Sequence, residues 1–134
     1  WEYFGRINNG RMILNDVGGI VAQQWLWLQE QYPYVELDEW VIMPDHFHGI
    51  VVINDNTHVG AGRDLPLPIT VPIKIKSMSE LIGAFKTTSS KLIRQHHSHD
   101  FQWQRSFHDH IIRNEESLHA IRQYIIDNPK NWIS

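Results

Sequence analysis

The sequence predicts an α+β protein in which helices pack on an antiparallel sheet. Two observations favour this class: short apolar runs are joined by turn residues, and three longer amphipathic segments each begin at a capping residue. The chain has 134 residues, of which 42% are hydrophobic. That is enough for a core of its own, so we expect residues 1–134 to form one domain.

The composition narrows the possible functions. The chain has no Cys, which excludes a disulfide framework and a thiolate site and favours a cytoplasmic location. No apolar run approaches the roughly 18 residues that a membrane span needs. The net charge of −3 counts mildly against a broad basic surface for nucleic acid. Because the chain starts at Trp1, in what reads as the end of a strand, we expect a strand upstream of it.

The first elements follow local signals. Asn9-Gly10 predicts a tight turn, so residues 1–14 are expected to form a short hairpin. Asn15 or Asp16 then caps a helix that runs from 17 to about 31. Residues at helical spacing along this segment are apolar, which predicts a face buried against the sheet.

A second hairpin is expected at the centre of the chain. Residues 35–43 form its first strand, Pro44-Asp45 supply the turn, and residues 46–53 form its second strand. Both faces of the second strand are apolar further along, which predicts that this strand is central in its sheet.

The remaining elements are two helices with an extended segment between them. Residues 54–76 hold several Gly and Pro residues and predict a long loop. Ser77 and Glu80 form a capping box that begins a helix, which ends near 96–100. Residues 101–113 are expected to form a strand or a bent strand. Asn114 then caps a last helix, which Pro129 stops.

Two histidines open the second strand of the central hairpin with Phe47 between them. Side chains at i and i+2 on a strand share a face, so His46 and His48 point the same way and could bind one metal ion. The alternative is a pair of hydrogen-bonded core histidines.

Spacing alone is weak evidence, because the chain holds three His-x-His pairs. His97/His99 falls in a polar run after a helix and is expected at the solvated surface. His108/His110 falls on the expected strand at 101–113, where structural or hydrogen-bonding roles are favoured.

The last helix supplies a second group. Tyr124 and Asn128 are four residues apart, so they project from one face of that helix. This placement is compatible with a structural role for both residues, with Tyr124 at the edge of the core and Asn128 as a helix cap before Pro129. They also suit a Tyr nucleophile and an amide oxygen that completes a three-ligand metal site with the two histidines. Imidazole and oxygen ligands fit Mn, Zn or Fe, and Mg less naturally.

Three segments together resemble a known family. They are MPDHFHGIVVI at 43–53, FK at 85–86 and WQRSFHDHIIRNEESLHAIRQYIIDNP at 103–129. In this order they resemble the single-tyrosine transposases of the HUH endonuclease superfamily. The branch they resemble most is that of the transposase-like proteins associated with repetitive extragenic palindromes.

The resemblance implies a ferredoxin-like or RRM-like antiparallel sheet with helices packed on it. It implies that His46, His48 and Asn128 bind a divalent metal, Mg or Mn, and that Tyr124 is the nucleophile. Members of this family cut single-stranded DNA, often near a hairpin, through a 5′-phosphotyrosine intermediate. Related proteins are homodimers or monomers.

The contacts with DNA are less specific in the sequence. Lys86 matches a Lys of the family, and Arg105 and Arg113 flank the segment before the last helix. Each could equally be a solvated surface charge. Trp103 could stack on a base, although a Trp at such a position more often lies in a core.

The sequence departs from the family pattern at Asp45, where many relatives carry Asn, and we favour a role in the turn for it. Two alternatives to a transposase stay open. One is a non-catalytic, domesticated DNA-binding protein on the same fold. The other is a metal hydrolase that uses the histidines without a covalent step.

Overall fold

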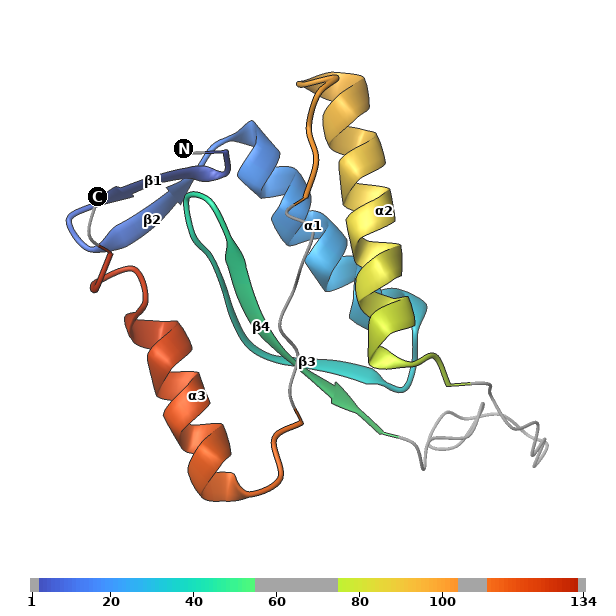
Figure 1. The fold of residues 1–134 in the computed structure, drawn as a ribbon, viewed down its shortest axis with the longest axis vertical. Helices are drawn as coiled ribbons and strands as arrows, with labels where there is room; N and C mark the ends of the chain where they lie inside the picture. Colours follow the sequence, from blue (N-terminus) through green and yellow to red (C-terminus); the bar gives the residue numbers. More distant parts are fainter. Residues whose placement is uncertain (1–2, 55–74, 104–110, 133–134) are drawn as a thin grey trace.

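The computed structural model describes residues 3–54, 75–103 and 111–132, and these form the α+β fold that the sequence predicts (Figure 1). The elements, in chain order, are β1 Gly5–Asn8, β2 Arg11–Leu14, α1 Asp16–Gln31, β3 Val35–Ile42, β4 Phe47–Ile53, α2 Met78–His96 and α3 Glu115–Asp127. Within these described residues the strands make two antiparallel sheets of two strands each, rather than the single sheet expected from the sequence.

The first hairpin has the turn that the sequence predicts. Asn9 and Gly10 both have positive φ, at 52° and 73°, and Asn8 pairs with Arg11. Positive φ at both turn positions matches the twist of the flanking strands, which is why Asn-Gly is favoured there.

Helix α1 is fixed at its start by Asn15, whose side chain accepts a hydrogen bond of 2.8 Å from the N–H of Gly18. Its buried side follows the predicted spacing, with Val21, Trp25 and Leu28 at most 1% exposed. Gly18 packs directly on the first segment of the chain. A Cβ there would lie 2.2 Å from the carbonyl oxygen of Phe4, so the close approach requires glycine.

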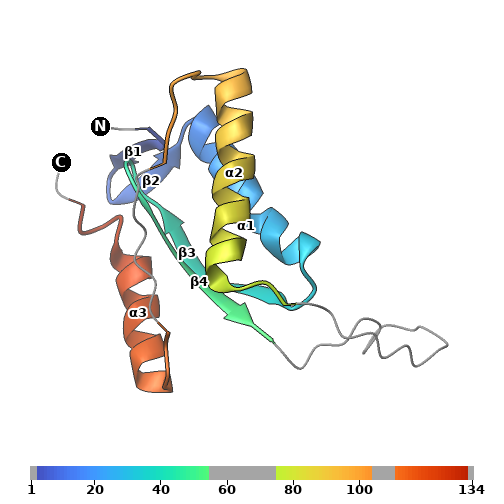
Figure 2. The same ribbon diagram turned by 45° about the vertical axis from the view of Figure 1, so that its right-hand side comes forward.

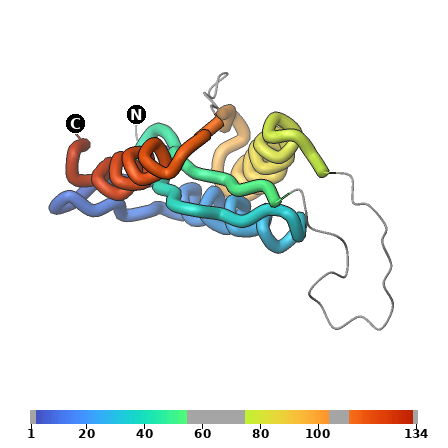
Figure 3. The backbone as a smooth tube through the Cα atoms, turned by 90° about the horizontal axis from the view of Figure 1, so that it is seen from below, coloured from blue at the N-terminus to red at the C-terminus, as the bar shows by residue number. Residues whose placement is uncertain are grey.

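The β3–β4 hairpin separates the helices into two groups. Phe47 of β4 contacts Trp25 of α1 and Phe85 of α2, with ring centroids 4.6 and 5.7 Å apart. The next residue, His48, points to the opposite side and contacts Tyr124 of α3. Figures 1 and 2 show α1 and α2 together on one side of the hairpin and α3 alone on the other. Seen from below, the hairpin lies between α1 and α3 (Figure 3).

The expected central position of β4 is not what the described residues show, because there β4 pairs with β3 alone. Ile50 is buried, as the pattern predicts, but Val52 on the same face is 40% exposed. Phe47 of this strand packs on the helices α1 and α2, whereas Val52 faces solvent.

Helix α2 begins at the predicted capping box. The Oγ of Ser77 accepts a hydrogen bond from the N–H of Glu80, and the carboxylate of Glu80 accepts one from the N–H of Ser77. Leu81, Phe85 and Ile93 form its buried stripe. His97 and His99, after the helix, are exposed as expected.

The prediction of a strand over 101–113 is wrong for the parts that the structure describes, since neither 101–103 nor 111–113 is strand. Phe101 and Trp103 instead pack on Phe4, with ring centroids 6.2 and 5.2 Å from it. The carbonyl of Phe101 accepts a hydrogen bond of 2.8 Å from the Nε of Arg94, which replaces the partner that a strand would supply. Alternating aromatic residues therefore fill the core from an irregular segment.

The two adjacent glycines of α1 give a test of this packing. Gly18→Ala is expected to lower the free energy of unfolding by about 1–3 kcal/mol, because the new methyl group meets backbone rather than a movable side chain. Gly19→Ala is the matched control, since a Cβ there meets nothing within 4 Å. It should raise stability by about 0.5–1 kcal/mol, the helix preference of Ala over Gly. Urea unfolding of both variants measures this, and equal effects would contradict the packing at Gly18.

Candidate active site

The two histidines at the start of β4 lie next to each other. The ring centroids of His46 and His48 are 4.8 Å apart and their planes are nearly perpendicular, at 81°. The turn that carries them is firmly held: the N–H of Met43 donates to the carbonyl of His46, and the carbonyl of Pro44 accepts from the N–H of Phe4. Met43 and Pro44 are both fully buried. The backbone that carries the two imidazoles is therefore well packed.

Asp45 has a larger role than the turn residue we expected. Its Oδ1 lies 2.6 Å from the Nδ1 of His46. An ionised carboxylate can only accept a hydrogen bond, so this contact places the hydrogen of His46 on Nδ1 and leaves Nε2 with its lone pair. Metal-binding histidines are commonly oriented in this way by a carboxylate.

His48 is half-buried, as is His46. Burial lowers the pKa of His48 below its ordinary value of 6.5, and the nearby His46 lowers it further when that ring is charged. His48 is therefore neutral at pH 7, which is the form in which an imidazole binds a metal.

Helix α3 brings Tyr124 to this pair of rings. The ring centroids of Tyr124 and His48 are 5.4 Å apart with an interplanar angle of 75°. The helix is seated by Ile125, which is 3% exposed, while Tyr124 itself is 59% exposed. The phenol is thus open to a large substrate while its ring rests beside an imidazole.

Asn128 directly follows α3 and is one turn beyond Tyr124. Its Nδ2 donates a hydrogen bond of 2.9 Å to the carbonyl of Tyr124, which is the capping role that the sequence allowed. Among the described residues, the Oδ1 of this amide accepts no hydrogen bond. The contact leaves that oxygen available as a ligand.

The site has one aromatic neighbour that was not predicted from the sequence. The indole of Trp132 lies against His46, with ring centroids 6.0 Å apart and planes tilted by 33°. Nothing in the local pattern around Trp132 predicts this contact, because it depends on where α3 ends relative to the hairpin.

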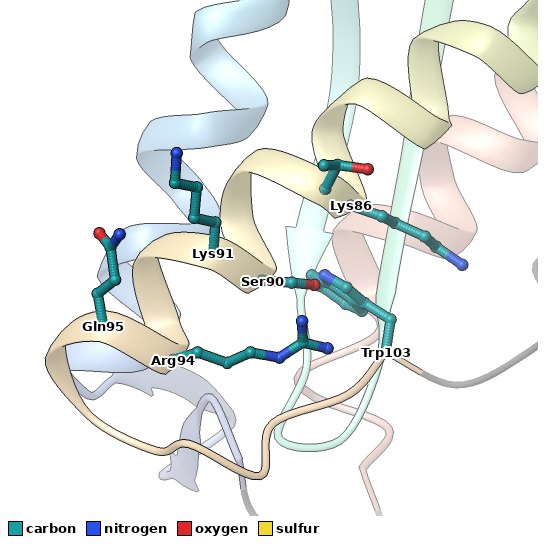
Figure 4. A pocket seen from close by; sticks show the side chains of 7 residues that line it. Lys86, Ser90, Lys91, Arg94, Gln95 and Trp103 are labelled. Carbon is teal, nitrogen blue, oxygen red and sulfur yellow. The ribbon is translucent and has the colours of Figure 1, made fainter.

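Of the predicted DNA-binding cations that the structure describes, Lys86 does not lie beside the histidines. Lys86 lies on α2, on the other side of the hairpin from α3, and burial lowers its pKa. It lines a groove of about 470 Å³ together with Thr87, Ser90, Lys91, Arg94, Gln95 and Trp103 (Figure 4). Trp103 is only partly buried, and its Nε1 donates to the Oγ of Ser89. Arg113 is exposed just before α3, whereas Arg105 and the pair His108/His110 lie outside the described residues.

The donor set fits a divalent metal by its chemistry. Two imidazole nitrogens and one amide oxygen are ligands that Mn, Zn and Fe accept, and Mg less readily. Within 3–54, 75–103 and 111–132, no group of three or more His, Cys, Asp or Glu residues gathers as a metal site. A metal on His46 and His48 would therefore need the amide of Asn128 or oxygens from a substrate.

Comparisons with known proteins find one matching family model and one related protein. Residues 69–128, which include α2, α3, Tyr124 and Asn128, match the family model described as "Transposase IS200 like". An uncharacterised protein of Haemophilus influenzae is 38% identical over an alignment of 134 positions, which covers 96% of this chain and 73% of the relative. Residues 69–128 are thus similar to the IS200-like transposases, and the chain as a whole is related to the Haemophilus influenzae protein.

The family match begins after the central hairpin, so Asp45, His46 and His48 lie outside it. No solved structure matches the chain. None of the helices in the described parts of the chain is long and apolar enough to cross a membrane.

The burial of His48 predicts its titration. By proton NMR, the ring of His48 should titrate with a midpoint below 6.5. The unfolded chain takes up this proton first, so the free energy of unfolding should decrease as the pH falls from 6.5 through the folded-state pKa, and lose nothing from this group above 6.5. His48→Gln should remove that part of the acid sensitivity. A midpoint at or above 6.5 would contradict the buried position of the ring.

The contact between Asp45 and His46 predicts one tautomer. In ¹⁵N NMR spectra at neutral pH, neutral His46 should carry its hydrogen on Nδ1, and Asp45→Ala should give a mixture of tautomers. Asp45→Asn is the matched control, because its amide oxygen can accept the same hydrogen bond. A tautomer that does not change in Asp45→Ala would show that the carboxylate does not orient the ring.

Proposed function

We propose that this protein is a metal-dependent endonuclease and strand transferase for single-stranded DNA, with Tyr124 as its nucleophile. The observation that carries the proposal is the meeting of Tyr124 with His48, across 76 residues of sequence, at a ring-centroid distance of 5.4 Å. The similarity of residues 69–128 to the IS200-like transposases supports the reaction class. Neither observation alone would support this reaction as well as the two together.

The proposed reaction is a phosphoryl transfer. The phenol oxygen of Tyr124 bonds to the phosphorus of the scissile phosphodiester, and the bond from phosphorus to the 3′ oxygen breaks. The phenol loses its proton and the 3′ oxygen gains one, so the fragment upstream of the cut leaves with a 3′-hydroxyl. The fragment downstream of the cut stays linked to Tyr124 through its 5′-phosphate. Attack by a 3′-hydroxyl on this phosphotyrosine reverses the step and joins two strands, without ATP.

The residues around Tyr124 have separate parts in this proposal. His46, His48 and the Oδ1 of Asn128 would hold a divalent metal, Mg or Mn, whose charge would polarise the scissile phosphate. Asp45 orients His46, with Oδ1 2.6 Å from Nδ1, and burial keeps His48 neutral. The 59% exposure of Tyr124 suits a strand of DNA better than a small substrate.

The nature of the DNA and the assembly are part of the same proposal. We propose a hairpin-containing single strand as the substrate, in keeping with the palindrome-associated branch. We propose a homodimer or a monomer as the assembly, and the contact of Tyr124 with His48 of its own chain is compatible with cleavage by one protomer. Lys86, Arg105 and Arg113 are proposed to contact the phosphates of the strand.

The reaction leaves a covalent product that can be tested directly. Hairpin-containing single-stranded DNA and Mn²⁺ should give a protein–DNA adduct on a denaturing gel, and Tyr124→Phe should abolish it because the oxygen nucleophile is lost. Tyr32→Phe is the matched control, since it removes a phenol that lies near Trp27 and Tyr34 rather than near the histidines. This control should form the adduct like the parent protein.

Two other results would overturn the proposed mechanism. Cleavage that persists in Tyr124→Phe would indicate a metal hydrolase that uses water. DNA binding with no adduct from any hairpin substrate would indicate a domesticated binding protein.

A further inference from the structure

We infer that the ion pair between Arg122 of α3 and Asp38 of β3 fixes the rotation of α3 about its own axis and so holds Tyr124 beside His48. Arg122 and Asp38 are in this view positioning residues rather than catalytic ones. The importance of this position for strand cleavage rests on the proposed function. The contact itself does not.

The contact joins the helix to the sheet through two parallel hydrogen bonds. The Nε of Arg122 donates to Oδ1 of Asp38 at 2.8 Å, and its Nη2 donates to Oδ2 at 2.6 Å. A guanidinium held by both oxygens of a carboxylate has a defined plane as well as a defined distance. The pair thus restricts orientation, which a contact through a single point would not.

The carboxylate is itself held in place by an irregularity of the hairpin. Leu37 pairs with Val51 and Trp40 pairs with Gly49, so Asp38 and Glu39 stand opposite the single residue Ile50. A bulge of this kind turns side chains away from the regular alternation of a strand.

The local contacts of Asp38 hold its carboxylate in one position. Its Oδ1 also accepts a hydrogen bond of 2.7 Å from the N–H of Glu39, and its side chain is only 17% exposed. The hydrogen bond from Arg122 keeps the pKa of Asp38 below its ordinary value, so the carboxylate stays charged at neutral pH.

The apolar contacts of α3 do not define its rotation well. Ile125 is the one buried residue of this helix, while Leu118 and Ile121 are half-buried and Ile126 is 48% exposed. The other side-chain hydrogen bonds of α3 stay within the helix and its cap, as far as the described residues go. A helix with so narrow a buried face can turn without exposing much more apolar surface.

The positions around the helix show why Arg122 controls Tyr124. At about 100° per residue, Arg122 lies about 60° to one side of Ile125 and Tyr124 lies about 100° to the other. Asp38 meets the first side and His48 meets the second. Any rotation of α3 that moves the phenol away from His48 must also separate Arg122 from Asp38, so the ion pair opposes it.

The first test distinguishes an effect on the position of Tyr124 from an effect on DNA binding. With hairpin DNA and Mn²⁺, Asp38→Asn and Arg122→Gln should each lower the single-turnover rate of adduct formation at saturating DNA by tenfold or more. The DNA concentration for half-saturation should change by less than twofold. The double variant should be no slower than the slower single variant, because both changes remove one contact.

Gln123→Ala is the matched control, since it removes only a hydrogen bond to Asp127 within the helix. It should react like the parent protein, and all rates are measured below the unfolding temperature of each variant. Unchanged rates in Asp38→Asn and Arg122→Gln would overturn the inference, as would additive losses in the double variant.

The second test needs no catalysis. The chain has no Cys, so spin labels can be attached at Gln23→Cys on α1 and Glu116→Cys on α3, both exposed positions. The distribution of label distances should be narrow in the parent background and clearly broader when Asp38→Asn is added, and Gln123→Ala should leave it narrow. An unchanged distribution in Asp38→Asn overturns the inference. If the parent forms no adduct but Asp38→Asn still broadens the distribution, the proposed function fails and the positioning role stands.

Discussion

The structure depends on the way β4 is held between two different surfaces. Phe47 packs between Trp25 and Phe85, and the neighbouring Gly49 leaves room for the same indole: a Cβ there would lie 2.6 Å from Trp25. Because strand residues alternate, an aromatic cluster that fixes Phe47 on one face also fixes His48 on the other. The core thereby sets the direction of the candidate ligand. Trp25 stays there although, among the described residues, its buried Nε1 has no hydrogen-bond partner, which indicates that the packing outweighs the unmet polar group.

Most of the fold could be predicted because short-range sequence signals determine where its elements begin and turn. The Asn9-Gly10 turn, the caps at Asn15 and Asn114 and the capping box at Ser77 each concern residues within about one helical turn of one another. The segment after α2 could not be predicted in the same way. An alternating aromatic pattern suits a strand and also suits an irregular segment whose rings fill a core, and only the position of Phe4 decides between them.

The candidate site was predictable in part for the same reason. The shared face of His46 and His48 follows from strand geometry, and the shared face of Tyr124 and Asn128 follows from helix geometry. Their meeting across the molecule was expected only from the resemblance to a family. Asp45, Asp38 and Trp132 were missed because each acts through a partner whose position depends on tertiary structure: a ring orientation, a bulge and the end of a helix.

The turn that carries the histidines has a consequence for affinity. Its backbone is tied to Phe4, and Met43 and Pro44 are fully buried, so the two imidazoles have little freedom left once the chain has folded. The conformational entropy of these two side chains is therefore lost when the chain folds, and not when a ligand binds. A ligand that binds this pair finds both imidazoles already in position. Its free energy of binding therefore reflects the bonds it forms, because little entropy is lost in ordering the protein.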